Sequence, residues 1–294
     1  MSSFEIHQLL LSDGGRLRAV RRALRETVRP GSVVVDLGAG TGILGFLALR
    51  AGASRVYAIE RHPILRLARA IAAENGFGDR VRFVKGDSRR VRLPERADLV
   101  VSDFVGPLGI DPEMAESVAD ARRFLKKGGR FLPERSEVWI APVRAAELHR
   151  RHVEAGKGHG VRLDAVRAIA ANRVGCFPGM PRSLAAPLRR ALVFEFARDD
   201  AAFPRRARMT FRVGGGAVHG IVIVVRVRVS KSVRLESTFG AHWKPVFLPV
   251  KTPIATRPGD RLEAELVLHD GTNVEWRLGD QRQSTLLENA AYGA

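Results

Sequence analysis

Apolar residues in the first half of the chain form short continuous runs, and longer amphipathic stretches separate them. A continuous apolar run is typical of a strand that is covered on both faces, as in a parallel sheet flanked by helices. The runs predict strands at 32–37, 55–60, 81–87 and 97–103, with another beginning at residue 130. The amphipathic stretches predict helices at 42–52, 62–76 and 111–129. The alternation therefore predicts a Rossmann-like, doubly wound α/β domain.

The last of these helices carries residues that are typical of helix ends. Asp111 is a suitable N-cap, and Pro112 suits the first turn, where a missing N–H costs little. Lys126 and Lys127 suit the C-terminal end, because the helix dipole is negative there. We therefore expect one continuous helix over this stretch.

The hydrophobic pattern changes after about residue 134, where apolar and polar residues begin to alternate. A period of two is typical of strands that bury one face, as antiparallel sheets do. Strands are expected at 136–143, 191–197, 207–213, 219–230, 261–270 and 273–280, with a turn at 269–273. The chain therefore divides near Pro133 into an N-terminal helix plus α/β domain, residues 1–133, and an antiparallel β-barrel or sandwich domain, residues 134–294.

Composition narrows the classes of protein that the chain can be. The 294 residues include 49 Lys and Arg against 31 Asp and Glu, which gives a net charge of +18. A charge of this size attracts nucleic acid, acidic peptides or anionic cofactors, although a solvated basic surface also fits it. No basic segment is interleaved with aromatic residues, as a single-strand binder would usually have.

Nothing in the pattern indicates a membrane or an oxidising compartment. No apolar stretch is long enough to span a bilayer, and the N-terminus lacks a basic segment followed by an apolar core, so no signal peptide is expected. Cys176 is the only cysteine, which excludes an internal disulfide. We expect a cytoplasmic protein with neither a membrane partner nor a bound metal.

A glycine-rich loop directly follows the first predicted strand, in the stretch VVVDLGAGTGILG. Gly38, Gly40 and Gly42 form a G-x-G-x-G pattern, and Asp36 lies at the strand end. Glycine permits a sharp turn and a close approach of the backbone to a ligand. Shifted by one glycine, the run from Gly40 to Gly45 also fits the G-x-G-x-x-G pattern of nicotinamide enzymes. The first form resembles the S-adenosylmethionine loop of Rossmann-like methyltransferases, and the strand-end acid favours it.

Acidic residues end four successive predicted strands: Asp36, Glu60, Asp87 and Asp103. The carboxyl ends of parallel strands meet at one edge of a sheet, where open α/β folds bind ligands. At that edge Glu60 can accept hydrogen bonds from both ribose hydroxyls and Asp87 from the adenine amine, while Asp103 faces the reaction crevice. The loop and the acids together predict S-adenosylmethionine as the cofactor.

The chain resembles the protein arginine methyltransferase family along nearly its whole length. The similar segments are 6–24, 34–60, 102–109, 121–139, 219–229 and 241–249. The segment AHWKPVFLP is the most specific, since it matches the family's Thr-His-Trp loop with Ala241 in place of Thr. The resemblance implies a divergent, bacterial-type member with a class I, S-adenosylmethionine-dependent methyltransferase domain followed by a β-barrel.

The resemblance also implies roles for individual residues. His7, Asp13 and Arg16 lie in register with the family's N-terminal helical segment, and Arg16 would pair with the methionine carboxylate of the cofactor. Asp13 would pair with His242 across the acceptor pocket, where the histidine is a proton acceptor or a structural clamp. Family members commonly form head-to-tail dimers through an arm, so a homodimer is expected, with its arm within residues 143–190.

The acceptor loop departs from the family pattern. Two family glutamates bracket the substrate guanidinium, which is planar and stays protonated. Here Asp103 stands for the first, and the second falls on Pro112, between Asp111 and Glu113. We expect Asp103 to orient the acceptor, assisted by Glu113 or Asp111. The expected walls of the substrate pocket are Leu10, Phe104, Met114 and Trp243.

Three functions stay open for this sequence. The first is N-methylation of a guanidino or other nitrogen group, in a peptide, a protein or free arginine. The second is N- or O-methylation of a small molecule in a biosynthetic pathway, which the altered acceptor loop favours. The third is a non-catalytic basic scaffold that binds nucleic acid or acidic partners, and the full set of cofactor acids argues against it. Nucleic acid is not required for either enzymatic function.

Overall fold

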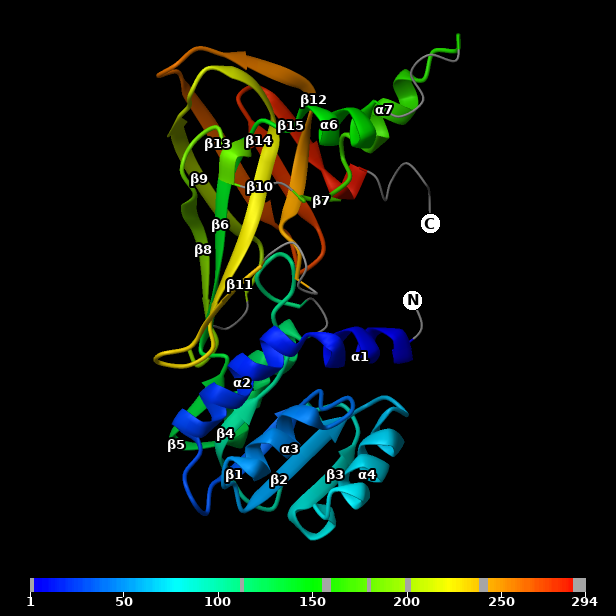
Figure 1. Cartoon of the computed structure of the whole chain (residues 1–294), viewed down its shortest axis with the longest axis vertical. Coiled ribbons are helices and arrows are strands. Elements are labelled where there is room, and N and C mark those ends of the chain that lie inside the picture. The colour runs from blue at the N-terminus through cyan, green and yellow to red at the C-terminus, as the bar shows by residue number, and fades with distance from the viewer. Residues whose placement is uncertain are drawn as a thin grey trace.

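The computed structural model describes residues 3–111, 114–154, 160–178, 181–198, 202–237 and 243–287. Figure 1 shows a parallel sheet with helices in its lower half, antiparallel strands in its upper half and helix α2 (Gly14–Thr27) between them. The last strand of the parallel sheet ends at Leu132, and the first antiparallel strand begins at Arg135. None of the helices in the described ranges is long and apolar enough to cross a membrane.

The parallel sheet has five strands in the order β3-β2-β1-β4-β5. The strands are β1 (Val33–Leu37), β2 (Arg55–Glu60), β3 (Val81–Lys85), β4 (Ala97–Val101) and β5 (Leu125–Leu132). Since β1 pairs with β2 on one side and β4 on the other, the winding of the chain reverses at β1. Open α/β sheets bind ligands at such a reversal, outside the carboxyl ends of the strands.

Helices flank this sheet in the predicted order, which confirms the doubly wound α/β class. They are α1 (Ser3–Ser12), α2, α3 (Ile43–Arg50), α4 (Leu65–Glu74) and α5 (Ala115–Asp120), with the 3₁₀ helices η1 (Gly78–Arg80) and η2 (Ala121–Phe124). Every residue of β1 is buried, which agrees with its continuous apolar run.

One predicted helix, 111–129, is wrong at both ends. Helix α5 starts later, with Met114 rather than Asp111 at the N-cap position, and β5 begins before the predicted end. Lys126 therefore lies in a strand, where its Nζ is 2.9 Å from the carboxylate oxygens of Asp98. The pairing of β5 with β4 outweighs the local helix signals, because it satisfies the backbone groups along the edge of β4.

The second half of the chain forms two antiparallel sheets, which confirms the predicted β class. One has the order β7-β12-β10-β6-β8, with β11 paired to β10, and the other has the order β15-β14-β13-β9. The strands are β6 (Arg135–Val143), β7 (Gly175–Cys176), β8 (Arg189–Glu195), β9 (Arg205–Arg212), β10 (Gly216–Arg228), β11 (Arg234–Glu236), β12 (Val246–Thr256), β13 (Arg261–Leu268), β14 (Val274–Leu278) and β15 (Gln281–Ser284).

Two aromatic side chains join the layers of the molecule. Trp276 of β14 is fully buried, and its Nε1–H donates to the Pro249 carbonyl of β12 at 2.7 Å, which ties one antiparallel sheet to the other. Phe104, in the loop after β4, packs edge-on against Phe131 of β5 and Phe196 just after β8. One hydrophobic core therefore runs from the parallel sheet into the antiparallel sheets.

Both ends of helix α2 are fixed. Asp13 is its N-cap residue, and the Asp13 carboxylate accepts a hydrogen bond from the Arg16 N–H at 2.9 Å. Near the other end, the Glu26 carboxylate accepts hydrogen bonds from the hydroxyls of Ser230, at 2.7 Å, and Ser232, in the loop between β10 and β11. The cap fixes the start of the helix, and the serine contacts hold its end against the antiparallel half of the molecule.

Two further helices, α6 (Ala146–Val153) and α7 (Asp164–Ala170), lie within the segment expected to hold the arm. A 3₁₀ turn, η3 (Pro181–Ser183), follows them. Figure 1 shows α6 and α7 at the upper end of the antiparallel sheets, projecting to one side.

Candidate active site

The loop between β1 and α3 turns through three glycines in the left-handed region of backbone conformation. The φ angles are +65° at Gly38, +54° at Gly40 and +79° at Gly42, values that other residues adopt only with strain. A Cβ atom at Gly40 would lie 2.6 Å from Cε1 of His7 in α1. Glycine therefore lets the loop pass directly under α1.

Asp36 supports this loop from inside the sheet. Its side chain is fully buried, and its Oδ2 accepts a hydrogen bond from the Gly45 N–H at 2.8 Å. Burial, assisted by the charges of Glu60 and Asp103 and opposed by the Gly45 hydrogen bond, raises the pKa of Asp36 to about 7. Asp36 lines none of the three cavities described below, so in this structure it positions the glycine loop.

Glu60, at the end of β2, links the glycine loop to the loop that follows β2. Its Oε2 accepts a hydrogen bond from the Gly40 N–H at 2.9 Å, and its Oε1 accepts one from the His62 N–H at 2.7 Å. The side chain is buried yet lines the first cavity. A buried carboxylate with free lone pairs beside a cavity is suited to accept hydrogen bonds from a ligand.

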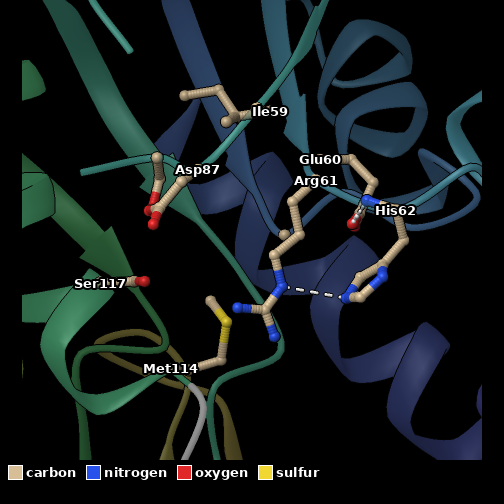
Figure 2. A pocket seen from close by; sticks show the side chains of 10 residues that line it. Ile59, Glu60, Arg61, His62, Asp87, Met114 and Ser117 are labelled. Atoms are coloured by element: carbon tan, nitrogen blue, oxygen red, sulfur yellow. Dashed lines mark hydrogen bonds between the residues drawn. The ribbon is translucent and has the colours of Figure 1, made fainter. Parts of the chain in front are cut away.

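The first cavity is an open cleft of about 170 Å³ at the carboxyl ends of β1, β2 and β3. Its wall is formed by Gly38, Ile59, Glu60, Arg61, His62, Gly86, Asp87, Ser88, Met114 and Ser117. In Figure 2, Asp87 and Ser117 lie on one side of the cleft, with Glu60 and His62 on the other. The Arg61 Nε–H donates to Nε2 of His62 at 3.0 Å. The carboxylates of Asp87 and Glu60 thus lie on opposite sides of the cleft.

Asp87 belongs to a charged network at the rim of this cleft. Arg89 holds the Asp87 carboxylate at 2.7 Å and also contacts Glu116 of α5. The Arg89 hydrogen bonds lower the pKa of Asp87 to about 2, so this carboxylate is ionised at neutral pH. The network connects the loop after β3 to α5, and both elements lie on the side of the cleft that faces Glu60.

The second cavity, of about 50 Å³, lies on the other side of Gly38 and contains an ion pair. Arg16 Nη1 is 2.8 Å from Asp103 Oδ2, and Arg16 Nη2 donates to the Leu10 carbonyl at 2.9 Å. The Arg16 side chain is only 5% exposed, against 23% for Asp103. The two residues predicted to serve cofactor and acceptor separately are thus paired with each other.

The third cavity, of about 20 Å³, lies where α2 and β4 meet the antiparallel sheets. Arg16 and Asp103 line it as well, and Trp243 closes it from the barrel side. The other lining residues are largely apolar: Val20, Leu44, Val101, Ser102, Leu132, Pro133, Val227, Val229 and Leu235. Shared lining residues therefore connect three cavities in a row, from Asp87 past Gly38 and Asp103 to Trp243.

Several predicted site residues stand apart from this row. Phe104 is fully buried in the core, which corrects its assignment as a pocket wall. Met114 lines the first cavity and not the third. Its Cε would lie 3.3 Å from a Cβ atom added at Gly38. The Asp111 N–H donates to the Phe104 carbonyl at 2.9 Å, and none of the three cavities includes it. His242 and Glu113 lie outside the described residues.

Sequence reasoning assigned no function to Arg61, His62 and Arg89, which line or border the first cavity. Arg61 and His62 directly follow the strand-end Glu60, and Arg89 follows Asp87 by two residues. Their closeness to predicted strand ends was the available signal.

Burial lowers the pKa of His7 in α1 against the opposing charge of Glu60, so His7 meets the glycine loop as a neutral ring.

Comparison with protein families matches the profile of a methyltransferase domain to residues 34–129. Among curated proteins, protein arginine N-methyltransferase 6 of Danio rerio is 35% identical over 145 residues, which cover 48% of this chain and 42% of that protein. Histone-arginine methyltransferase CARMER of Anopheles gambiae is 26% identical over 281 residues, 89% of this chain and 45% of that protein. The matched region spans about half or less of the length of such relatives.

Solved structures share the fold over almost the entire chain. A chain of the Trypanosoma brucei PRMT1 enzyme–prozyme heterotetrameric complex with AdoHcy has a TM-score of 0.84 at 19% identity, covering 95% of this chain and 96% of that one. Arabidopsis thaliana protein arginine methyltransferase 10, in an open conformation, has a TM-score of 0.79 at 19% identity, covering 95% and 97%. The α/β half and the antiparallel half thus occur together in known proteins.

Proposed function

We propose that the chain belongs with the protein arginine methyltransferases, a family of class I methyltransferases, and that it transfers a methyl group from S-adenosylmethionine to a nitrogen of a guanidino-type acceptor. The observation that carries the proposal is the row of three cavities, with the Arg16–Asp103 pair at its centre. It supports one binding position for a cofactor and a second for an acceptor, with charged groups between them.

The residues of the first two cavities fit S-adenosylmethionine. Glu60 would accept hydrogen bonds from the ribose, and Asp87, which is ionised, from the adenine amine. Gly38 lines both cavities and has no side chain, so a ligand that extends from one cavity into the other can approach the backbone closely at its left-handed turn. Arg16 would bind the methionine carboxylate with a charge-assisted contact. The cofactor supplies a methyl group on a positively charged sulfur.

Asp103 would orient the acceptor. A guanidinium offers five N–H donors, and a fixed carboxylate beside it holds one nitrogen toward the methyl group at roughly 3–3.5 Å. Since Asp103 already pairs with Arg16, binding of a cofactor carboxylate by Arg16 would free Asp103 for the substrate. Arg16 thereby connects cofactor binding to acceptor binding.

The remaining acid–base groups are assigned from the family resemblance. Asp111 or Glu113 would supply a second carboxylate, and His242 with Asp13 would accept the proton that the acceptor nitrogen loses, or would clamp the barrel to α2. Asp13 serves as the N-cap of α2, so a charge on it also stabilises that helix.

A small-molecule acceptor is the second candidate. Asp103 is the only carboxylate among the described residues that line the third cavity, and most of the others are apolar. A single carboxylate already neutralised by Arg16 suits a compact acceptor with little charge of its own. A small nitrogen or oxygen compound without a guanidino group would then be the acceptor.

We also propose that the protein acts as a cytoplasmic homodimer. The exposed thiol of Cys176 is compatible with a reducing compartment. The projecting helices α6 and α7 carry exposed apolar residues, among them Val166, which is 49% exposed. Such residues are suited to bury surface against a second copy of the chain.

Two measurements test the proposed function. Calorimetry with S-adenosylhomocysteine should give a dissociation constant in the micromolar range, and absence of binding at millimolar ligand would rule out the cofactor assignment. Transfer of a labelled methyl group is then compared for arginine-rich peptides, free arginine and the low-mass fraction of a cell extract. Labelling confined to low-mass compounds without a guanidino group would exclude the guanidino assignment and favour the small-molecule function.

A further inference from the structure

Helix α2 presents two different faces. Arg16, Val20, Ala23 and Leu24 are buried against the rest of the protein. The outward face carries exposed arginines at the spacing of one helix face: Arg18, Arg21, Arg22 and Arg25, with Arg29 just beyond the helix end. At about 1.5 Å per residue, the stripe from Arg18 to Arg29 is roughly 16 Å long. We call these five residues the α2 arginine stripe.

Four of the five arginines in the stripe lack a carboxylate partner among the described residues. Arg22 pairs with Glu26 at 3.5 Å, but no ion pair to Arg18, Arg21, Arg25 or Arg29 occurs within the described part of the chain. Arginines on the antiparallel sheets behave differently. Arg206 and Arg208 both pair with Glu265, at 3.1 and 3.3 Å, and Arg282 pairs with Glu275 at 2.6 Å.

Compared with these paired arginines, the four unpaired arginines of the stripe leave their positive charge uncompensated on one face of α2. Like charges three and four residues apart repel each other along a helix, so the stripe destabilises α2 unless an external anion neutralises it. At Arg206, Arg226 and Arg282 of the barrel, by comparison, a glutamate on a neighbouring strand compensates the arginine. A regular row of unpaired guanidinium groups is complementary to a regular row of negative charges.

We propose that the α2 arginine stripe binds the phosphate backbone of double-stranded nucleic acid, independently of sequence. Guanidinium groups bind phosphate oxygens through paired N–H donors, and phosphates recur along a duplex at regular short intervals. No aromatic residue lies in α2, so the base stacking that single-strand binders use is missing. Duplex phosphates therefore fit the stripe better than unpaired bases.

The site is separate from the proposed active site, although it is on the same helix. Arg16 reaches Asp103 from the buried face of α2, whereas the stripe faces away from the cavities. Figure 1 shows α2 at the junction of the two halves of the molecule. A duplex bound there would keep the protein, and any acceptor carried on that nucleic acid, close together without occupying the cofactor cleft.

The salt dependence of binding to a labelled DNA duplex of about 20 base pairs tests this proposal on the unaltered protein. If each of the four unpaired arginines neutralises one phosphate, the logarithm of the affinity should fall with the logarithm of the salt concentration at a slope of about −3 to −4. The triple variant Arg18→Gln, Arg21→Gln, Arg25→Gln should bind roughly tenfold more weakly or worse. The triple variant Arg206→Gln, Arg208→Gln, Arg282→Gln loses the same charge from paired positions and should bind within about twofold of the unaltered protein.

Four results would overturn the proposal. They are an equal loss in both triple variants, no binding at about 50 mM salt, tighter binding of a single strand than of the duplex, and equal binding of polyglutamate, which would indicate an acidic protein partner. Calorimetry with S-adenosylhomocysteine on the stripe variant serves as the control for folding. An unchanged cofactor affinity together with lost duplex binding separates this site from the proposed methyl transfer.

Discussion

Arg16 lies between the two proposed ligands, and its contacts define what the site does at the scale of single residues. Its guanidinium is held by the Asp103 carboxylate and by the Leu10 carbonyl. An arginine that is nearly fully buried retains its charge and therefore needs such partners. In the proposed mechanism the methionine carboxylate replaces Asp103 as the anionic partner of Arg16, and Asp103 turns to the acceptor.

The contact of Gly40 with His7 gives a test at this scale. Replacing Gly40 by Ala adds a Cβ 2.6 Å from the His7 ring in a left-handed conformation, so we expect a loss of about 1–3 kcal/mol in unfolding free energy and much weaker S-adenosylhomocysteine binding. Gly31→Ala is the matched control, because φ is +86° there and no atom lies within 4 Å of the added Cβ. Equal cofactor affinities in the two variants would contradict the account.

Part of the site could be predicted from single residues and part could not. The strand-end acids Glu60, Asp87 and Asp103 line the cavities, because the end of a parallel strand is readable from its apolar run. The pairing of Arg16 with Asp103 depends on where α2 crosses β4, which no local pattern encodes. Phe104 was misassigned, because a single apolar residue after a strand does not reveal whether it faces a pocket or the core.

At the scale of elements, α6 joins the antiparallel sheets through two buried histidines. His149 Nε2 is 2.8 Å from the Val250 carbonyl oxygen, and His219 Nδ1 accepts from the Ala145 N–H at 3.3 Å. Their ring centroids are 5.6 Å apart. Burial lowers the pKa of both rings, and each histidine is kept neutral by this packing. The charged groups nearby include His152, Glu154 and Arg167.

Acid should therefore loosen α6. A histidine whose folded pKa is depressed contributes stability above its unfolded pKa of about 6.5 and loses it as the pH falls, because the opened state binds protons more readily. We expect amide exchange in residues 145–154, corrected for intrinsic rates, to rise roughly tenfold or more between pH 7.5 and pH 5. The variant His149→Gln, His219→Asn retains hydrogen-bonding groups without titrating and should remain protected. Equal acid sensitivity in both proteins would reject this role.

Elements were predictable where the hydrophobic pattern is local. Strands β1, β2 and β4 are buried along nearly their whole length, as their continuous apolar runs predict, and the first half of β13 alternates. Strands β6 and β10 occur where they were expected, but the middle of each is buried on both faces. The error at 111–129 arose because Lys126 and Lys127 resemble a helix end, whereas the sheet needed a partner for β4. Strand β12 was not predicted, because its first residues belong to the segment 241–249, which resembles a family loop motif.

At the scale of the whole molecule, the change from continuous to alternating apolar runs anticipated the two-part architecture. The relative placement of the halves follows from contacts that are distant in sequence, such as Glu26 with Ser230 and Phe104 with Phe196. The row of exposed arginines without ion pairs on one face of α2 also emerges only at this scale. Net charge alone could not separate a paired arginine from an unpaired one.

The proposed homodimer is tested by mass in solution. Light scattering at micromolar concentration should give twice the mass of one chain. Val161→Asp with Val166→Asp places charges at apolar positions that are 68% and 49% exposed, and should shift the mass to that of a monomer. Thr272→Asp, in an exposed turn, should leave the mass unchanged. A monomer mass for the unaltered protein would exclude the dimer.

The most direct test of the central claim is methyl transfer by the unaltered protein and by Asp103→Asn, measured with labelled cofactor and a guanidino acceptor. The unaltered protein should form N-methylated product. Asp103→Asn should lose about 100-fold or more in kcat, because its amide cannot hold the cationic acceptor, while S-adenosylhomocysteine affinity stays within about fivefold. Product formed equally by both proteins, or none formed by an unaltered protein that binds the cofactor, would contradict the account.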